Sequence, residues 1–109
     1  MKTITLNYND KEYTLEFTRK TVETMAKQGF KITDVVEQPI LGVPALFQGA
    51  FLANHSNVRK AIVDDIYAHV THRTELINAL ADMYNAPTMA LIEDVEDTAG
   101  NASWTVTEK

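Results

Sequence analysis

Apolar and polar residues alternate along the first 17 residues of the chain. The apolar positions of this segment are Ile4, Leu6, Tyr8, Tyr13, Leu15 and Phe17. Residues 9–11 have turn chemistry and separate two runs with a period of two. This pattern predicts a β-hairpin over residues 1–17. Because a two-stranded hairpin is marginally stable alone in water, its apolar face needs helices packed over it.

Helical spacing begins directly after the hairpin. Thr18 is a suitable N-cap, and Val22 and Met25 share one face of the segment that follows. Gly29 matches a glycine C-cap. The pattern predicts a first helix over residues 19–28.

Prolines divide the next apolar segment. Residues 33–34, Thr-Asp, are suited to start a short helical turn that Pro39 ends. Pro44 fits the first turn of another helix, which runs to the polar residues 54–56. This helix has scarcely any polar face, so we expect it to be buried on several sides. Gly49 in its middle indicates close packing against a neighbour.

Two amphipathic helices are expected after residue 56. Ser56 caps the first in this interpretation, and the helix ends near Val70. Either Thr71 or Thr74 opens the second. The inward positions of the second helix are Leu76, Ile77, Leu80, Met83 and Tyr84.

The end of the chain is divided by Pro87 and Gly100. Pro87 breaks or restarts the helical pattern, and the apolar residues after it predict a last short helix ending near Gly100. In residues 100–109, Trp104 and Val106 alternate with polar residues, which fits a third, edge strand or a tail.

The predicted fold class is therefore α+β, in a single domain over residues 1–109. A hairpin over residues 1–17 packs against about four to five helices in residues 18–99. Residues 100–109 form a tail or a third, C-terminal strand.

Composition restricts the setting in which this domain works. The chain has no cysteine, so neither a disulfide nor a thiolate metal site contributes to its stability. Its amino terminus lacks the features of a secretory signal, and prolines and glycines interrupt the apolar stretches before they reach membrane-spanning length. We expect a cytoplasmic protein that does not enter a membrane.

Charge is unevenly distributed along the chain, whose formal net charge is -5. Residues 1–60 have eight Lys/Arg and six Asp/Glu, while residues 61–109 have two and nine. An acidic second half repels phosphate backbones, so direct nucleic-acid binding is not expected. A basic segment of a partner protein fits this half better.

Asp65, His69 and His72 are spaced by four and three residues, which places them on neighbouring turns of one helix. They are therefore candidates for metal ligands. A small metal-dependent enzyme is a hypothesis that rests on these three residues. However, Thr71 interrupts the predicted helix, and two histidines without a surrounding motif are more often an accident of the surface. The favoured interpretation therefore assigns them no metal.

No other group of residues matches a catalytic or cofactor-binding motif. The acidic cluster consists of Glu93, Asp94, Glu96 and Asp97. It lacks the spacing of a calcium loop, so a solvated helix face explains it better than paired catalytic carboxylates. The glycines are too scattered to cradle a phosphate. We predict no catalytic residue and no cofactor.

The helix that is apolar all round supplies the candidates for partner binding. These residues are Leu46, Phe47, Phe51 and Leu52. Core packing is the commoner meaning of such a pattern, but a domain of this size has a limited interior, so one side of the helix is open to an interface interpretation. Trp104 is either a lid on the hairpin or an anchor for a partner.

The order of these features resembles small tail assembly chaperone-type proteins of long-tailed phages that infect Gram-positive hosts. The resemblance rests on diffuse motifs, strongest from Tyr13 to His55 and near Trp104. They are Glu16-Phe17-Thr18, Gln28-Gly29-Phe30, Leu46-Phe47-Gln48-Gly49-Ala50-Phe51, Asn54-His55, and the helical residues Leu76, Ile77, Leu80 and Met83.

The resemblance implies a non-enzymatic protein of tail morphogenesis. Such a protein holds the tape measure protein soluble, helps tail-tube subunits assemble around it, and leaves the finished virion. The expected partner is thus a protein, and self-association is left open. An alternative hypothesis is a small acidic anti-defence protein that inhibits a host nuclease by protein binding, because an acidic surface can occupy a nucleic-acid channel.

Overall fold

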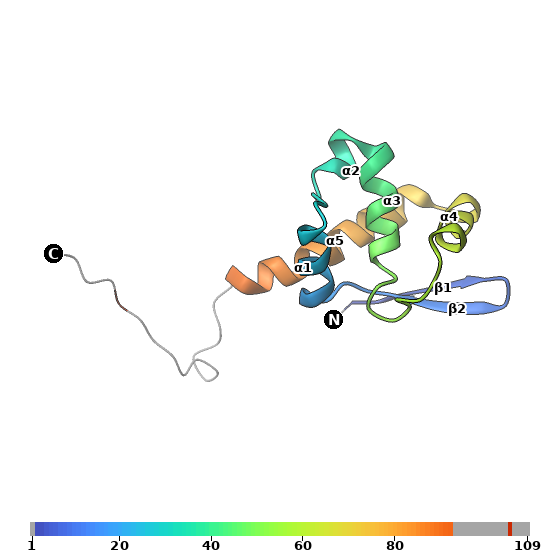
Figure 1. The fold of residues 1–109 in the computed structure, drawn as a ribbon, viewed down its shortest axis with the longest axis horizontal. Helices are drawn as coiled ribbons and strands as arrows, with labels where there is room; N and C mark the ends of the chain where they lie inside the picture. The colour runs from blue at the N-terminus through green and yellow to red at the C-terminus, as the bar shows by residue number, and fades with distance from the viewer. Residues whose placement is uncertain (1, 93–104, 106–109) are drawn as a thin grey trace.

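A computed structural model describes residues 2–92 and 105 of the chain. Its elements are β1 (Ile4–Tyr8), β2 (Lys11–Leu15), α1 (Arg19–Lys27), α2 (Asp34–Glu37), α3 (Pro39–Gly49), α4 (Lys60–His69) and α5 (Arg73–Ile92). The hairpin lies along one side of the helices, and α5 runs the length of the helical layer (Figure 1). The predicted α+β class, with an N-terminal hairpin and five helices, is confirmed.

The hairpin forms because two residues at its tip tolerate a left-handed backbone. β1 and β2 are antiparallel, with Ile4 opposite Leu15 and Tyr8 opposite Lys11. Asn9 and Asp10 have φ angles of 50° and 62°. Positive φ at both central residues matches the right-handed twist of the two strands, and Asn and Asp adopt it at low cost.

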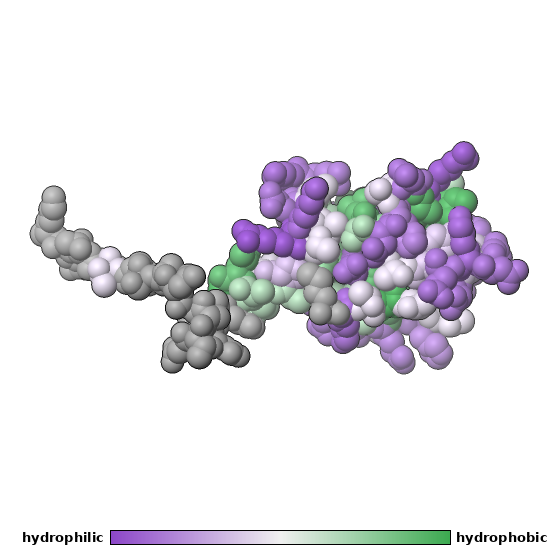
Figure 2. All heavy atoms as spheres, turned by 90° about the horizontal axis from the view of Figure 1, so that it is seen from below, coloured by the Kyte–Doolittle hydropathy of each residue, from purple (hydrophilic) through white to green (hydrophobic). Residues whose placement is uncertain are grey.

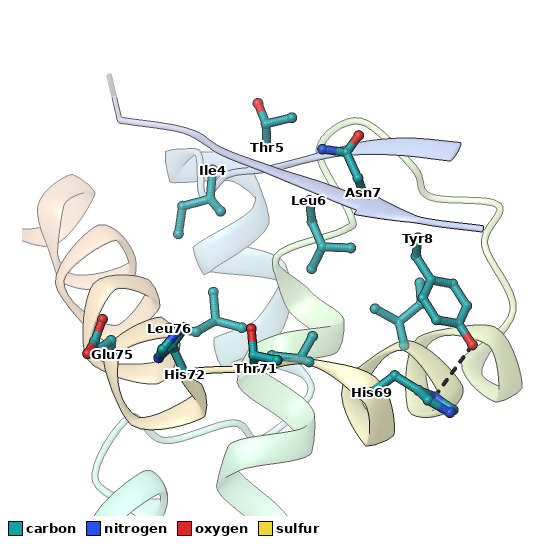
Figure 3. Close-up of a pocket in the computed structure, with 12 residues that line it drawn as sticks. Ile4, Thr5, Leu6, Asn7, Tyr8, His69, Thr71, His72, Glu75 and Leu76 are labelled. Carbon is teal, nitrogen blue, oxygen red and sulfur yellow. Dashed lines mark hydrogen bonds between the residues drawn. The ribbon is translucent and has the colours of Figure 1, made fainter. Parts of the chain in front are cut away.

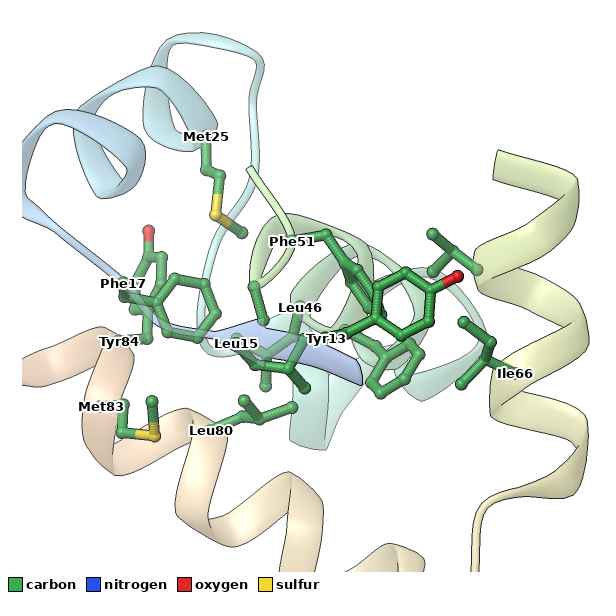
Figure 4. Close-up of a cluster of buried hydrophobic side chains, with 13 residues drawn as sticks. Tyr13, Leu15, Phe17, Met25, Leu46, Phe51, Ile66, Leu80, Met83 and Tyr84 are labelled. Carbon is green, nitrogen blue, oxygen red and sulfur yellow. The ribbon is translucent and has the colours of Figure 1, made fainter. Parts of the chain in front are cut away.

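The core lies where β2 meets α3, α4 and α5. Its buried apolar residues are Tyr13, Leu15, Phe17, Met25, Leu46, Phe47, Ala50, Phe51, Val63, Ile66, Leu80, Met83 and Tyr84. Figure 4 shows Leu15 in the middle of this cluster, with Leu46 of α3 and Leu80 of α5 beside it. The predicted apolar face of the hairpin thus packs against the helices, β2 more deeply than β1.

The predicted first helix is confirmed as α1, together with its cap. Thr18 and Thr21 form a capping box: the Thr21 N–H donates to Thr18 Oγ1 at 3.1 Å, and the Thr18 N–H donates to Thr21 Oγ1 at 2.9 Å. Gly29 has a φ of 94° and lets the Phe30 N–H return to the Met25 carbonyl at 3.0 Å. α1 therefore ends just before Gly29, which adopts the left-handed backbone conformation that this helix end requires.

The short helical turn predicted to end at Pro39 is confirmed as α2, but the helix start predicted at Pro44 was wrong. Pro39, not Pro44, is the first residue of α3, and Pro44 lies inside that helix. The residue before a proline is pushed away from helical geometry, and Gln38 accordingly has φ -137° and ψ 66°. The break between α2 and α3 therefore falls at Gln38. Thr33 has a helical backbone and no side-chain cap bond, so it does not cap α2.

Residues 50–55 do not continue the regular α-helix of α3. They lie along the edge of β2 that does not pair with β1. The Phe51 and Leu52 N–H groups donate to carbonyls three residues back, at 3.1 Å each. The Ala50 carbonyl accepts the Glu16 N–H at 3.1 Å. His55 Nε2 accepts the Thr14 N–H at 2.9 Å, which requires the ring proton on Nδ1. The segment after α3 thus covers the edge of the hairpin.

Two further helix boundaries differ from the prediction. Ser56 does not cap α4, which begins at Lys60 after an extended Arg59. α5 begins at Arg73, between the two predicted threonines, after His72 with a φ of 53°.

α5 does not break at Pro87. It continues through this residue to Ile92 as one helix of 20 residues. Its predicted inward face is confirmed, since Leu80, Met83 and Tyr84 are buried. Val95, Ala99 and the tail or third strand predicted for residues 100–109 lie outside the described residues, apart from Thr105, which is exposed and belongs to no element.

Two glycines allow helices to approach closely. A Cβ atom on Gly42 would overlap the backbone of Asp34 and Val35 in α2, which has no freedom to move aside. A Cβ atom on Gly49 would overlap the end of the Met25 side chain, which can rotate. The close packing predicted for Gly49 is confirmed, and Gly42 fixes α2 against α3.

We predict that Gly42→Ala lowers the free energy of unfolding by about 1–3 kcal/mol, because overpacking against backbone outweighs the better helix propensity of alanine. Gly49→Ala is the matched comparison and should cost less, since only a flexible side chain must move. Urea unfolding followed by circular dichroism measures both. Equal losses, or a stabilised Gly42→Ala, would contradict this account of the α2–α3 contact.

Candidate protein-binding surface

The predicted partner-binding residues of α3 and the segment after it belong to the core. Leu46, Phe47 and Phe51 are 0%, 1% and 1% exposed, and Leu52 is half-buried. The Phe47 ring lies 5.2 Å from Phe51 and 5.0 Å from Tyr67, in tilted or edge-on geometry. Core packing, not an interface, is therefore what this fold assigns to the three buried residues. Trp104 lies outside the described residues.

An apolar groove runs beside the last two turns of α5, and we call it the α5 groove. It encloses about 390 Å³, within the range of pockets that hold small ligands or side chains. Its apolar lining consists of Phe17, Met83, Ala86, Pro87, Ala90 and Leu91. It lies between the end of β2, the start of α1 and the end of α5.

The groove exists because the core stripe of α5 continues past the residues that cover it. Leu80, Tyr84, Pro87 and Leu91 follow one another at intervals of three or four and share one face of the helix. Leu80 and Tyr84 are 0% and 7% exposed, whereas Leu91 is 56% exposed. The same stripe is core in one half of α5 and open surface in the other.

Other faces of this helix end are also apolar. Met89 is 49% exposed and Ile92 is 74% exposed, although neither belongs to the groove. Figure 2 shows apolar surface gathered at this end of the domain. A helix that is apolar all round is ordinarily buried, so this end of α5 has the character of a contact surface.

The polar residues beside the α5 groove are cationic. Lys2 and Arg19 line it together with the apolar residues, and both are exposed. This differs from the prediction of a basic partner for the acidic half of the chain. The four residues of the acidic cluster lie outside the described residues. The charges that the structure shows beside the groove are those of Lys2 and Arg19, which belong to the amino-terminal half of the chain.

A second apolar surface projects where α2 meets α3. Val36, Ile40 and Leu41 are 84%, 86% and 62% exposed, and we call them the apolar corner. The close contact at Gly42 fixes the position of the corner against the rest of α3. Glu37 and Gln38 are the polar residues within this corner.

A more polar recess lies between β1 and the junction of α4 and α5. It encloses about 440 Å³. Figure 3 shows Ile4, Leu6 and Tyr8 directed into it and Thr5 and Asn7 directed away, as expected for a strand with a period of two. His69, His72 and Glu75 line the same recess, so two imidazoles and a carboxylate lie beside these apolar side chains.

The metal candidates do not come together at this recess. The Tyr8 hydroxyl donates to the Asp65 carboxylate and lies 3.5 Å from His69 Nδ1, which is itself 2.8 Å from the Asp65 carbonyl oxygen. His72 lies apart from His69, before the start of α5 (Figure 3). Across residues 2–92, no group of three or more His, Asp or Glu residues is close enough to hold a metal ion.

Hydrogen bonding and burial each raise the pKa of a tyrosine. The bond to the Asp65 carboxylate, with a smaller effect of burial, raises the pKa of Tyr8, because a phenolate would lose this bond and face a like charge. Burial raises the pKa of Tyr84. Both shifts favour the neutral phenol, which donates a bond in the first case and packs in the core in the second.

The two open surfaces were missed by sequence reasoning, although their signals are present. Residues 86–92 contain only one polar residue, Thr88, but were divided between two helices at Pro87. Residues 35–41 are mostly apolar but were interpreted as a short turn and a loop. Pro87 was interpreted as a break or restart, whereas α5 continues through it, and Pro39 was interpreted only as the end of a short turn, whereas it also begins α3.

A protein-family model matches nearly the whole chain. The family described as "Domain of unknown function (DUF5055)" matches residues 1–107. No curated protein and no solved structure matches the chain. Among the helices of the described residues, none combines the length and apolar character needed to cross a membrane. The match spans the hairpin and all five helices.

Truncation of a core phenylalanine should destabilise the whole domain instead of only weakening a contact. We predict that Phe47→Ala lowers the free energy of unfolding by about 3–5 kcal/mol, because it removes a ring that is 1% exposed. Leu41→Ala on the exposed corner serves as the control and should cost little. Circular dichroism during urea unfolding measures both, and a Phe47→Ala variant of nearly unchanged stability would restore the interface interpretation.

Stability should fall at alkaline pH because of the two tyrosines. Their folded pKa values are raised, so their contribution is complete below about pH 10 and is lost as the pH rises through the folded values. We expect the decrease in urea midpoint between pH 8 and pH 11 to be smaller in Tyr8→Phe and in Tyr84→Phe than in the unmodified chain. An identical decrease in all three proteins would show that these hydroxyls do not contribute.

Proposed function

We propose that this chain, which belongs to the family described as "Domain of unknown function (DUF5055)", is a non-enzymatic protein-binding protein that acts as a phage tail assembly chaperone. Its client in this proposal is the tape measure protein, which it holds soluble while tail-tube subunits assemble. The resemblance in the order of sequence features suggests this role. The observation that carries the protein-binding part is the α5 groove.

The α5 groove suits one face of an amphipathic helix. Binding of this kind uses apolar side chains at intervals of three, four and seven residues, laid into a hydrophobic groove. The groove has a comparable lining, because Met83, Ala86 and Ala90 follow one another at intervals of three and four residues along α5. A long helical protein contains many such apolar faces, which would associate with one another if left uncovered.

The cations beside the groove give the proposal a charge preference. Lys2 and Arg19 favour a client helix whose apolar face is bordered by aspartate or glutamate. Exposed ion pairs contribute little affinity, so we assign them orientation and speed of association, and we assign the affinity to burial of apolar surface.

Two polar contacts of the described residues fit a binding role, because they hold elements of the domain together. The Tyr8 hydroxyl bonds to the Asp65 carboxylate, and the His55 ring bonds to the backbone of Thr14. In these positions they join the hairpin to α4 and to the segment after α3. They act as structural links in this proposal, and no reaction step is assigned to them.

Co-expression with the tape measure protein encoded in the same genome tests the proposal. We expect the unmodified chain to raise the soluble yield of that protein and to copurify with it. Ala90→Arg should abolish both effects, because it places a cation in the apolar groove beside Arg19. Ala90 is exposed, so the domain itself should remain folded.

Asn85→Arg is the matched control for this experiment. It adds the same charge to the same helix, at an exposed position outside the groove lining, and should leave both the yield and the copurification unchanged. If the unmodified chain does not raise the yield, the chaperone role is wrong. If Ala90→Arg and Asn85→Arg behave alike, client binding does not use the α5 groove.

A further inference from the structure

The two open apolar surfaces of the domain have opposite shapes and lie in different places. The apolar corner consists of exposed side chains at the junction of α2 and α3, whereas the α5 groove is a hollow lined by residues at the start of α1 and the end of α5. The α2–α3 junction and the end of α5 lie in different parts of the domain (Figure 1). We propose that the apolar corner of one copy inserts into the α5 groove of a second copy, so that the chain associates with itself head to tail.

The apolar corner presents exposed aliphatic side chains on two helices that are held together. Ile40 and Leu41 are adjacent residues in the first turn of α3, and Val36 lies one turn earlier in α2. All three side chains are mostly exposed, and the backbone contact at Gly42 holds the two helices together. A projection already fixed before binding loses little conformational entropy when it is buried.

The charges of the two surfaces are complementary. Glu37 is the charged residue of the corner, and Lys2 and Arg19 are the charged residues beside the groove. None of the three belongs to an ion pair within the residues that the structure describes, where the pairs are Lys27 with Glu23 and Lys60 with Asp64. Insertion of the corner therefore brings a free carboxylate to two free cations.

This complementarity favours a corner-to-groove contact between two copies over pairing of two α5 ends. Pairing of two α5 ends about a twofold axis would bring Lys2 and Arg19 of both copies toward the same interface and repel. A contact between unlike surfaces places opposite charges together instead. Because each copy then keeps one unused corner and one unused groove, association continues with increasing concentration unless the rotation between copies closes a ring.

The inference does not depend on the proposed client, but it has a consequence for it. A second copy and a client helix would occupy the same groove and exclude each other. A corner variant should therefore lose self-association and keep client binding, whereas a groove variant should lose both.

Sedimentation velocity of two single variants and of their mixture tests the contact. Ile40→Ser alters only the corner and Ala90→Arg only the groove, and both residues are exposed, so both proteins should stay folded. The unmodified chain should form larger species as its concentration rises. Loss of the Ile40 side chain should weaken this about tenfold to a hundredfold.

The mixture gives the decisive result. Each variant alone should remain monomeric over the range in which the unmodified chain associates, but equal amounts should form a 1:1 dimer, because one partner keeps a working groove and the other a working corner. A monomeric mixture would overturn the proposal. So would an unmodified chain that is monomeric at every concentration, or an Ile40→Ser variant that still associates fully, which would indicate pairing through α5 alone.

A charge exchange tests the orientation of the contact. Glu37→Arg and Arg19→Glu should each weaken self-association, and mixing them should restore it, because the unaltered corner of the Arg19→Glu variant then meets the unaltered groove of the Glu37→Arg variant. Lys11→Glu on the hairpin makes the same charge change as Arg19→Glu away from both surfaces and should have no effect. Failure of the mixture to recover, or an equal loss in Lys11→Glu, would overturn the pairing of Glu37 with the groove.

Discussion

The contact of β2 with the helices is the interaction on which the rest of the structure depends. Tyr13, in the middle of the strand, lies edge-on to Phe51 at 5.6 Å, and Phe17, just beyond its C-terminal end, lies edge-on to Tyr84 at 5.5 Å. Leu15 between them is fully buried. A single short strand thus joins the segment after α3 to α5. Because a two-stranded hairpin is marginal in isolation, neither layer is expected to be stable without the other.

Covering the edge of β2 determines where α3 must end. The chain after Gly49 gives up regular helix so that the Ala50 carbonyl can accept the Glu16 N–H and His55 can accept the Thr14 N–H. These bonds occupy backbone groups that a free strand edge would otherwise offer to another chain. We therefore place the proposed contacts with other proteins at the α5 groove and the apolar corner, and not at this edge.

Both open surfaces arise where an element extends beyond its neighbours. α5 has 20 residues, and its apolar stripe continues past the part that β2 and α3 cover. The corner lies where α2 and α3 pack tightly against each other, which leaves their outer aliphatic side chains exposed. Each surface adjoins packed residues, because the buried Met83 lines the groove and the close contact at Gly42 lies beside the corner. A fixed apolar surface is suited to bind another protein chain, whether a client helix or a second copy.

The sequence by itself determined the elements that have a clear period and strong end signals. The alternation up to Phe17 specifies the hairpin, Thr18 and Gly29 specify α1, and the inward face of α5 follows from its spacing. Local rules suffice there, because a period of two or 3.6 defines which face of an element is apolar. Tertiary structure alone decided which apolar faces are covered: Phe47 is core and Leu91 is surface, although both lie in apolar helical segments. Coverage depends on neighbours distant in sequence, which no local pattern specifies.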